Sequence, residues 1–126
     1  FLSNATALTL APEAIALASP PDTFYGRVTG NATFTPAAGM PVEARIRGAV
    51  CGHDLTRAWE GEVVYVVDVH ANDGILSNCG NPGDMVVFYV AGRPMVPTAV
   101  WDNMQLNELT LAPAFPVYLP LVLRAK

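Results

Sequence analysis

Eleven prolines and ten glycines interrupt this 126-residue chain at short intervals, and their spacing constrains the fold more than any other feature. Both residues disfavour helix interiors, and the segments between them are rich in Val, Thr, Tyr and Phe, which favour strands. Only residues 14–18 could form a helical turn, and that run is too short to be stable alone. The pattern predicts an all-β fold, an immunoglobulin-like antiparallel β-sandwich of about seven strands.

The predicted strands occupy the segments between the turn residues. They are 23–29, 42–47, 55–60, 62–70, 85–91, 97–101 and 104–111. Apolar and charged residues alternate along 42–47, which indicates one buried and one solvent-exposed face. Residues 62–70 are apolar on both sides, which predicts a central strand. We therefore expect a single sandwich domain over 23–111, preceded by an extended segment, 1–22, and followed by a linker and strand, 112–126.

The end of the chain is unusually apolar. Residues 115–124 (FPVYLPLVLR) follow a Pro-rich linker, and their alternation predicts a strand with one apolar face. That face comprises Val117, Leu119, Leu121 and Leu123, and Tyr118 lies between them. Burying four such side chains would contribute roughly 6–12 kcal/mol before entropy losses, so the strand needs a core to enter. Prolines stiffen the linker, which favours delivery of the strand to a neighbouring copy.

These features predict a structural subunit of an extracellular, pilus-like filament. Its partner would be a second copy of itself, in a homopolymer assembled by insertion of a terminal strand. Residues 5–10 are a second candidate donor strand. In the alternative, the tail closes its own sandwich and the protein is a secreted adhesion or carbohydrate-binding accessory domain. Candidate aromatic residues for a surface or glycan ligand are Tyr25, Trp59, Tyr65, Tyr89 and Trp101.

Charge and hydropathy exclude several other partners. The net charge is −4, the only lysine is Lys126, and the arginines form no basic stripe, so we expect no nucleic-acid partner. No run of about 18 apolar residues is present, so we expect no membrane span. Because the chain begins with Phe1 in place of Met, we expect that a leader has been removed and that the protein is secreted, extracellular or at the cell surface.

Two cysteines, Cys51 and Cys79, predict one disulfide in an oxidising compartment. The closed loop of about 29 residues would contribute roughly 3–4 kcal/mol in the chain-entropy model. Two buried free thiols are one alternative. A zinc site that adds His53 and His70 is another, although the paired spacing typical of zinc ligands is missing.

No arrangement of residues indicates catalysis, so we expect no enzyme and no cofactor. The chain has three serines and two histidines, with no Gly-x-Ser-x-Gly turn and no Gly-rich phosphate loop. An incomplete calcium pattern includes Asp68, Asn72 and Asp73, and its alternative is a wet strand face followed by a turn. Two Asn-x-Thr sequons make Asn4 and Asn31 candidate glycosylation sites.

The central block resembles β-sandwich domains of secreted bacterial proteins, of the carboxypeptidase-regulatory-like and Cna-B-like kinds. The resemblance rests on three short motifs: Tyr25-Gly26-Arg27-Val28, Cys51-Gly52 and the run GDMVVFYV at 83–90. The ending YLPLVLR, 118–124, is similar to the C-termini of other secreted proteins of such bacteria. The resemblance implies an extracellular sandwich and says little about function, because sandwich domains serve many roles.

Overall fold

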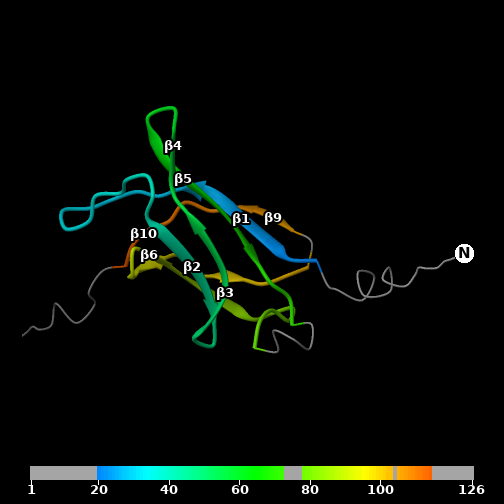
Figure 1. Cartoon of the computed structure of the whole chain (residues 1–126). Helices are drawn as coiled ribbons and strands as arrows, with labels where there is room; N and C mark the ends of the chain where they lie inside the picture. Colours follow the sequence, from blue (N-terminus) through cyan, green and yellow to red (C-terminus); the bar gives the residue numbers. More distant parts are fainter. Residues whose placement is uncertain (1–19, 73–77, 104, 115–126) are drawn as a thin grey trace, which may run out of the picture.

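The computed structural model describes residues 20–72, 78–103 and 105–114. These residues form ten strands in two facing sheets and contain no helix (Figure 1). The predicted all-β sandwich is therefore confirmed. The strand number exceeds the expected seven because four of the strands have only two or three residues, too few to show an alternating pattern.

The first sheet has four strands in the order β4–β5–β1–β9. They are β4 (Arg57–Trp59), β5 (Glu62–Val69), β1 (Asp22–Arg27) and β9 (Leu106–Glu108). The pairs β4–β5 and β5–β1 are antiparallel, whereas β1 and β9 are parallel. In the parallel pair Thr23 lies opposite Leu106, and Tyr25 lies opposite Glu108.

The second sheet has the order β10–β7–β6–β2–β3, and β8 also pairs with β6. Its strands are β10 (Ala112–Pro113), β7 (Arg93–Val96), β6 (Met85–Val90), β2 (Pro41–Ile46), β3 (Ala49–Leu55) and β8 (Ala99–Val100). All of these pairs are antiparallel. The register of β2 against β3 shifts between Ala44 and Arg45, which marks a β-bulge.

Alternating side chains of both sheets fill one core. Eighteen apolar side chains, including a T-shaped pair of Phe24 and Phe88 with ring centroids 5.3 Å apart, are at most 9% exposed. Leu111, close to the end of the described chain, is fully buried among them. The core of the described residues therefore extends from β1 to the segment just before β10.

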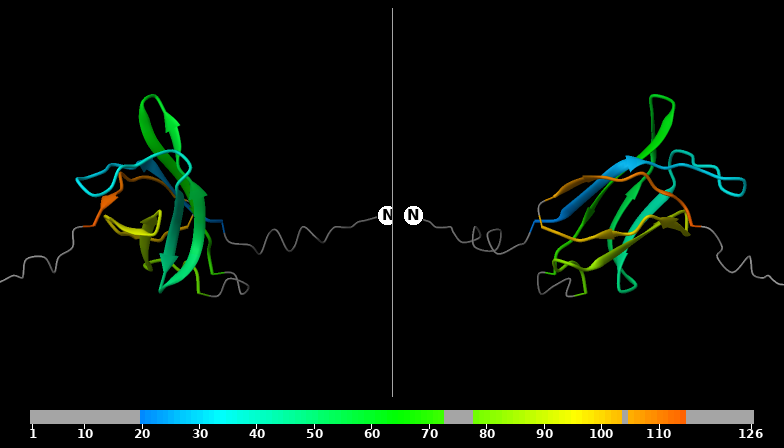
Figure 2. Two further views of the ribbon diagram at one scale, coloured as in Figure 1. Left: turned by 60° about the vertical axis from the view of Figure 1, so that its left-hand side comes forward. Right: turned by 180° about the vertical axis from the view of Figure 1, so that it is seen from behind.

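The sandwich is closed along both sides, where the two sheets meet (Figure 2). On one side β3 lies against β5, and the Cys51 carbonyl accepts a 2.8 Å hydrogen bond from the His70 N–H. On the other side the chain passes from β9 to β10. There the Leu111 N–H donates to the Arg27 carbonyl at 2.9 Å, and the Ala114 N–H donates to the Pro94 carbonyl at 3.0 Å. These hydrogen bonds hold the edges of the two sheets together.

The predicted disulfide is present between Cys51 on β3 and Cys79 in the segment before β6. Because the two sulfur atoms are bonded to each other, the free-thiol and zinc alternatives are wrong. Gly80 follows the disulfide and lies flat on the buried Trp101 ring, where a Cβ atom would overlap the indole. The Trp101 Nε1–H donates to the Val69 carbonyl at 2.9 Å, which ties this corner to β5.

Three hairpins share the same two-residue turn, in which a non-glycine residue precedes glycine. The pairs are Arg47-Gly48, Glu60-Gly61 and Ala91-Gly92, with φ of 51° and 82°, 50° and 80°, and 51° and 77°. Two consecutive positive φ angles define the type I′ turn, whose twist matches that of the flanking strands. Glycine takes the second position without strain, whereas the first residue bears the cost of a left-handed conformation.

Several sequence expectations need correction. The predicted strands 97–101 and 104–111 are reduced to Ala99–Val100 and Leu106–Glu108. Residues 49–55 form β3, although the polar stretch Gly52-His53-Asp54 gives no strand pattern, and the predicted strand 55–60 is reduced to Arg57–Trp59. Residues 93–96 form β7 despite Pro94. The first two residues of the predicted linker, Ala112 and Pro113, form β10 against β7, and Pro113 is buried.

Candidate functional site

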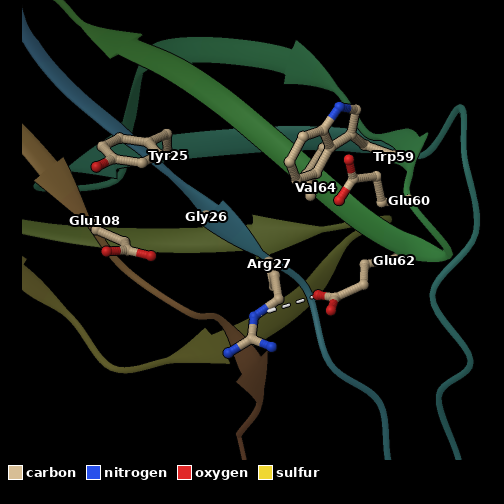
Figure 3. Close-up of a pocket in the computed structure, with 8 residues that line it drawn as sticks. All are labelled: Tyr25, Gly26, Arg27, Trp59, Glu60, Glu62, Val64 and Glu108. Atoms are coloured by element: carbon tan, nitrogen blue, oxygen red, sulfur yellow. Dashed lines mark ion pairs between the residues drawn. The ribbon is translucent and has the colours of Figure 1, made fainter.

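A groove of about 390 Å³ lies on the outer face of the first sheet, on the side away from the core (Figure 3). All four strands of this sheet, or the turns beside them, contribute to it. Its lining comprises Tyr25, Gly26, Arg27, Trp59, Glu60, Glu62, Val64 and Glu108. We call this feature the Trp59 groove.

Strand alternation explains why these side chains face outward. On β1, Phe24 points into the core, so its neighbour Tyr25 points to the outer face. On β5, Tyr65 is buried, so Val64 faces outward. Glu108 reaches the same face because β9 pairs directly with β1, which places it opposite Tyr25.

Trp59 occupies the last position of β4, beside the Glu60-Gly61 turn. Its side chain is 61% exposed, which is unusual for so large an apolar group. The β4–β5 hairpin projects beyond the rest of the described fold (Figure 1), so its tip cannot pack against the sandwich. An indole that gains nothing from the core in this position is suited to contact a ligand.

The groove carries three carboxylates and one guanidinium. Arg27 Nε lies 3.4 Å from Glu62 Oε1, and both side chains are about half exposed, so this ion pair contributes at most about 1 kcal/mol to stability. Figure 3 shows Tyr25 and Glu108 at one end of the groove and Trp59 and Glu60 at the other. The site therefore combines two aromatic rings with charged groups at both ends.

A partly buried hydrogen bond supports the groove from below. Gly26 has no Cβ, which lets the Leu109 carbonyl approach its backbone, where a methyl group would overlap that carbonyl. The same carbonyl accepts a 2.7 Å hydrogen bond from the Tyr65 hydroxyl, and the Leu109 N–H donates to the Tyr25 carbonyl at 2.8 Å. Burial raises the pKa of the Tyr65 hydroxyl, which keeps it a donor.

The structure separates the five aromatic candidates into three environments. Trp101 and Tyr65 are core residues, with 1% and 0% exposure. Tyr89, on the outer face of the second sheet, is covered by Arg45, whose guanidinium carbon lies 4.1 Å from the ring centroid. Tyr25 and Trp59 alone among the five line the groove. A Trp59–Tyr65 pair across the hairpin does not form, because Trp59 lies opposite Glu62.

Arg27, Glu60, Glu62 and Glu108 are site residues that the sequence analysis missed. Tyr25 and Arg27 are two residues apart on one strand, as are Glu62 and Val64. The alternation of side chains along a strand could therefore have placed each pair on one face. Nothing in the sequence indicates Glu108, because its position depends on the parallel pairing of β9 with β1.

The calcium candidate falls only in part on the described residues. The exposed Asp68 carboxylate accepts a 2.6 Å hydrogen bond from the Thr23 hydroxyl, and the Asn72 N–H donates to the Gly80 carbonyl at 2.8 Å. Asp73 lies outside the described residues. Within the described ranges, no three Asp, Glu, His or Cys side chains are grouped so that they could hold a metal ion.

Of the two glycosylation candidates and the predicted assembly strand, only one glycosylation candidate lies within the described residues. Asn31 is exposed in the loop between β1 and β2, and its Oδ1 accepts hydrogen bonds from the Thr33 N–H at 3.0 Å and the Thr33 hydroxyl at 3.2 Å. Asn4 and the proposed assembly strand lie outside the described residues. The residues of that strand are Val117, Tyr118, Leu119, Leu121 and Leu123.

Two carboxyl groups of the fold have shifted pKa values of opposite sign. Burial raises the pKa of Asp22, although its oxygens accept hydrogen bonds from the Asp102 N–H at 2.8 Å and the Asn107 side chain at 2.7 Å. The Asn81 N–H, at 2.9 Å, and Arg47, at 3.0 Å, lower the pKa of Asp84. Neither group lines the groove, so these shifts concern stability.

Comparisons with protein-family models, curated proteins and solved structures found no match to this chain. The resemblance to carboxypeptidase-regulatory-like and Cna-B-like domains therefore stays a prediction. The class that the fold defines is an all-β sandwich with one disulfide. Among the described residues no helix has the length and apolarity that a membrane crossing requires.

Proposed function

We propose that this protein is a non-catalytic, extracellular β-sandwich domain that binds carbohydrate in the Trp59 groove. The observation that carries the proposal is the 61% exposed Trp59 indole at one end of a groove whose other end holds Tyr25. The disulfide is compatible with an oxidising compartment outside the cytoplasm.

The chemistry of the groove suits a sugar. A pyranose ring presents C–H groups on its faces, which pack on exposed aromatic rings, and hydroxyl groups at its rim, which need hydrogen-bond partners. Carboxylates of Glu60, Glu62 and Glu108 accept from hydroxyl groups, and the Arg27 guanidinium donates to sugar oxygens. A concave site with apolar walls and few polar groups is typical of small-ligand binding.

The test is glycan binding by the full chain. An array of oligosaccharides, followed by calorimetry on those that bind, should give binding that Trp59→Ala reduces at least tenfold. Leu106→Ala is the matched control, because Leu106 is 72% exposed on the same sheet but does not line the groove. Absence of any saccharide ligand, or equal losses in both variants, would contradict the proposal.

A second function, assembly into a filament, is favoured by a different observation. The core described by the structure ends at Leu111, and the sequence predicts an apolar strand beyond it, which we propose serves a neighbouring copy. The outer face of the second sheet offers apolar side chains beside β10, the last described strand. Met85 and Val100 lie opposite one another there and are 59% and 64% exposed, and Val96 lies opposite Ala112.

We propose that residues 115–124 of one copy pack on this face, or on a sheet edge, of the next. The pairing of Ala112 and Pro113 with β7 sets where the tail should be cut: a deletion of 115–126 leaves β10 intact. Particle mass by light scattering and electron microscopy should show fibres or oligomers for the full chain and monomers after the deletion. Met85→Lys should weaken assembly as well. A full-length chain that is monodisperse at the mass of one copy would exclude this function.

A further inference from the structure

The charge of the Trp59 groove is unbalanced. Arg27 pairs with Glu62, and this leaves Glu60 and Glu108 without a cation. Among the described residues neither of these two carboxylates forms an ion pair or a hydrogen bond. Two uncompensated negative charges thus lie in a groove of about 390 Å³.

Each of these carboxylates lies beside one of the two aromatic rings. Glu108 is directly opposite Tyr25 on the parallel pair, and Glu60 follows Trp59 in the hairpin (Figure 3). A carboxylate next to the face of an aromatic ring attracts an ammonium group that is carried on an apolar body, because the carboxylate supplies charge and the ring supplies a cation–π contact. The groove repeats this arrangement at its two ends.

The separation of the two ends indicates the size of the ligand. Glu62 lies opposite Trp59, and Val66 lies opposite Tyr25, so the two aromatic positions are four residues apart along β5. At about 3.3 Å per residue this corresponds to about 13 Å. One sugar unit is too short to reach both ends, so an oligomer with repeated ammonium groups fits better than a monosaccharide.

We infer that the ligand is an oligosaccharide of amino sugars with free ammonium groups, an inference that rests on the proposed carbohydrate binding. A lysine-rich peptide carries the same charge but fits this surface less well. The groove lies on the face of a sheet whose backbone groups are already paired within the sheet, so a peptide backbone would find no strand edge to pair with.

Calorimetry with three hexasaccharides tests this inference. Glucosamine, N-acetylglucosamine and glucose hexamers are compared at mildly acidic pH, where the amines of the glucosamine hexamer are charged. We expect at least tenfold tighter binding of the glucosamine hexamer than of the acetylated hexamer, and a fall of that preference as salt rises. Glu108→Gln and the double variant with Glu60→Gln should reduce the preference stepwise toward one.

The matched control is Asp68→Asn, which removes one exposed carboxylate from β5 outside the groove and should leave the preference unchanged. Because Glu60 occupies the strained turn, Glu108→Gln alone provides the test should the double variant unfold. Equal affinity for all three hexamers would overturn the ammonium inference and leave carbohydrate binding standing. Binding of none would overturn both, and tighter binding of hexalysine than of the glucosamine hexamer would overturn the amino-sugar assignment.

Discussion

Removal of one buried hydroxyl, by Tyr65→Phe, should destabilise the sandwich by a predictable amount. The Tyr65 hydroxyl donates to the Leu109 carbonyl at 2.7 Å, and the Tyr65 side chain is fully buried. Loss of the hydrogen bond costs about 0.5–1.5 kcal/mol, and a buried carbonyl left without a donor costs up to about 3 kcal/mol. Leu109 is only half buried, so we expect the lower part of this range, about 1–2 kcal/mol.

Urea unfolding followed by tryptophan fluorescence measures this change as a lower midpoint at constant slope. Tyr25→Phe is the control, because the Tyr25 hydroxyl forms no hydrogen bond within the described residues and its loss should change stability by less than about 0.5 kcal/mol. Gly26→Ala acts on the same Leu109 carbonyl, so its cost and that of Tyr65→Phe should not add. Equal stability of Tyr65→Phe and Tyr25→Phe would refute the role assigned to this hydrogen bond.

Three further predictions concern stability. Ala91→Asn should raise the free energy of unfolding by about 1 kcal/mol, because asparagine tolerates the φ of 51° better, and a lower melting temperature would contradict this. Reduction of the Cys51–Cys79 disulfide should lower the free energy of unfolding by roughly 3–4 kcal/mol in urea unfolding, and an unchanged midpoint would contradict this. The contribution of Asp22 to the free energy of unfolding should be greatest below about pH 3.9 and decline as pH rises through its raised pKa, and that of Asp84 should be present above about pH 3.9 and be lost as pH falls through its lowered pKa. Urea unfolding of Asp22→Asn and Asp84→Asn against the parent chain over this pH range measures both contributions, and a pH-independent difference would contradict them.

Strands with a regular alternation were predictable from the sequence. The pattern over 42–47 gave β2 to within one residue, and the apolar run at 62–70 gave β5, because burial of one face repeats every second residue. β3 was not predictable, since Gly52, His53 and Asp54 carry no apolar pattern. Gly52 is required there because β3 passes so close to the Asp68 carbonyl of β5 that a Cβ would overlap it, a tertiary constraint.

The candidate site was predictable only in part, for the same reason. Alternation places Tyr25 and Arg27 on one face, and the Glu60-Gly61 turn places Trp59 at a hairpin tip. Which face of a sheet is exposed to solvent, and which aromatic side chains stay outside the core, depends on how the two sheets pack. Trp101 and Trp59 show this, because one is covered by Gly80 and the other is exposed, although both lie in short, mixed segments.

The parallel pairing of β1 with β9 has a consequence for how the chain folds. The buried Asp22 side chain accepts a hydrogen bond from the Asn107 side chain, 85 residues later in the chain. The first described strand can therefore complete its contacts only when almost the last one is in place. Until residues 106–111 arrive, one edge of β1 and part of the core stay open, and closing so long a loop makes folding slow. A chain that emerges from its N-terminus first therefore completes this core only after residues 106–111 are available, although its local hairpins can form earlier.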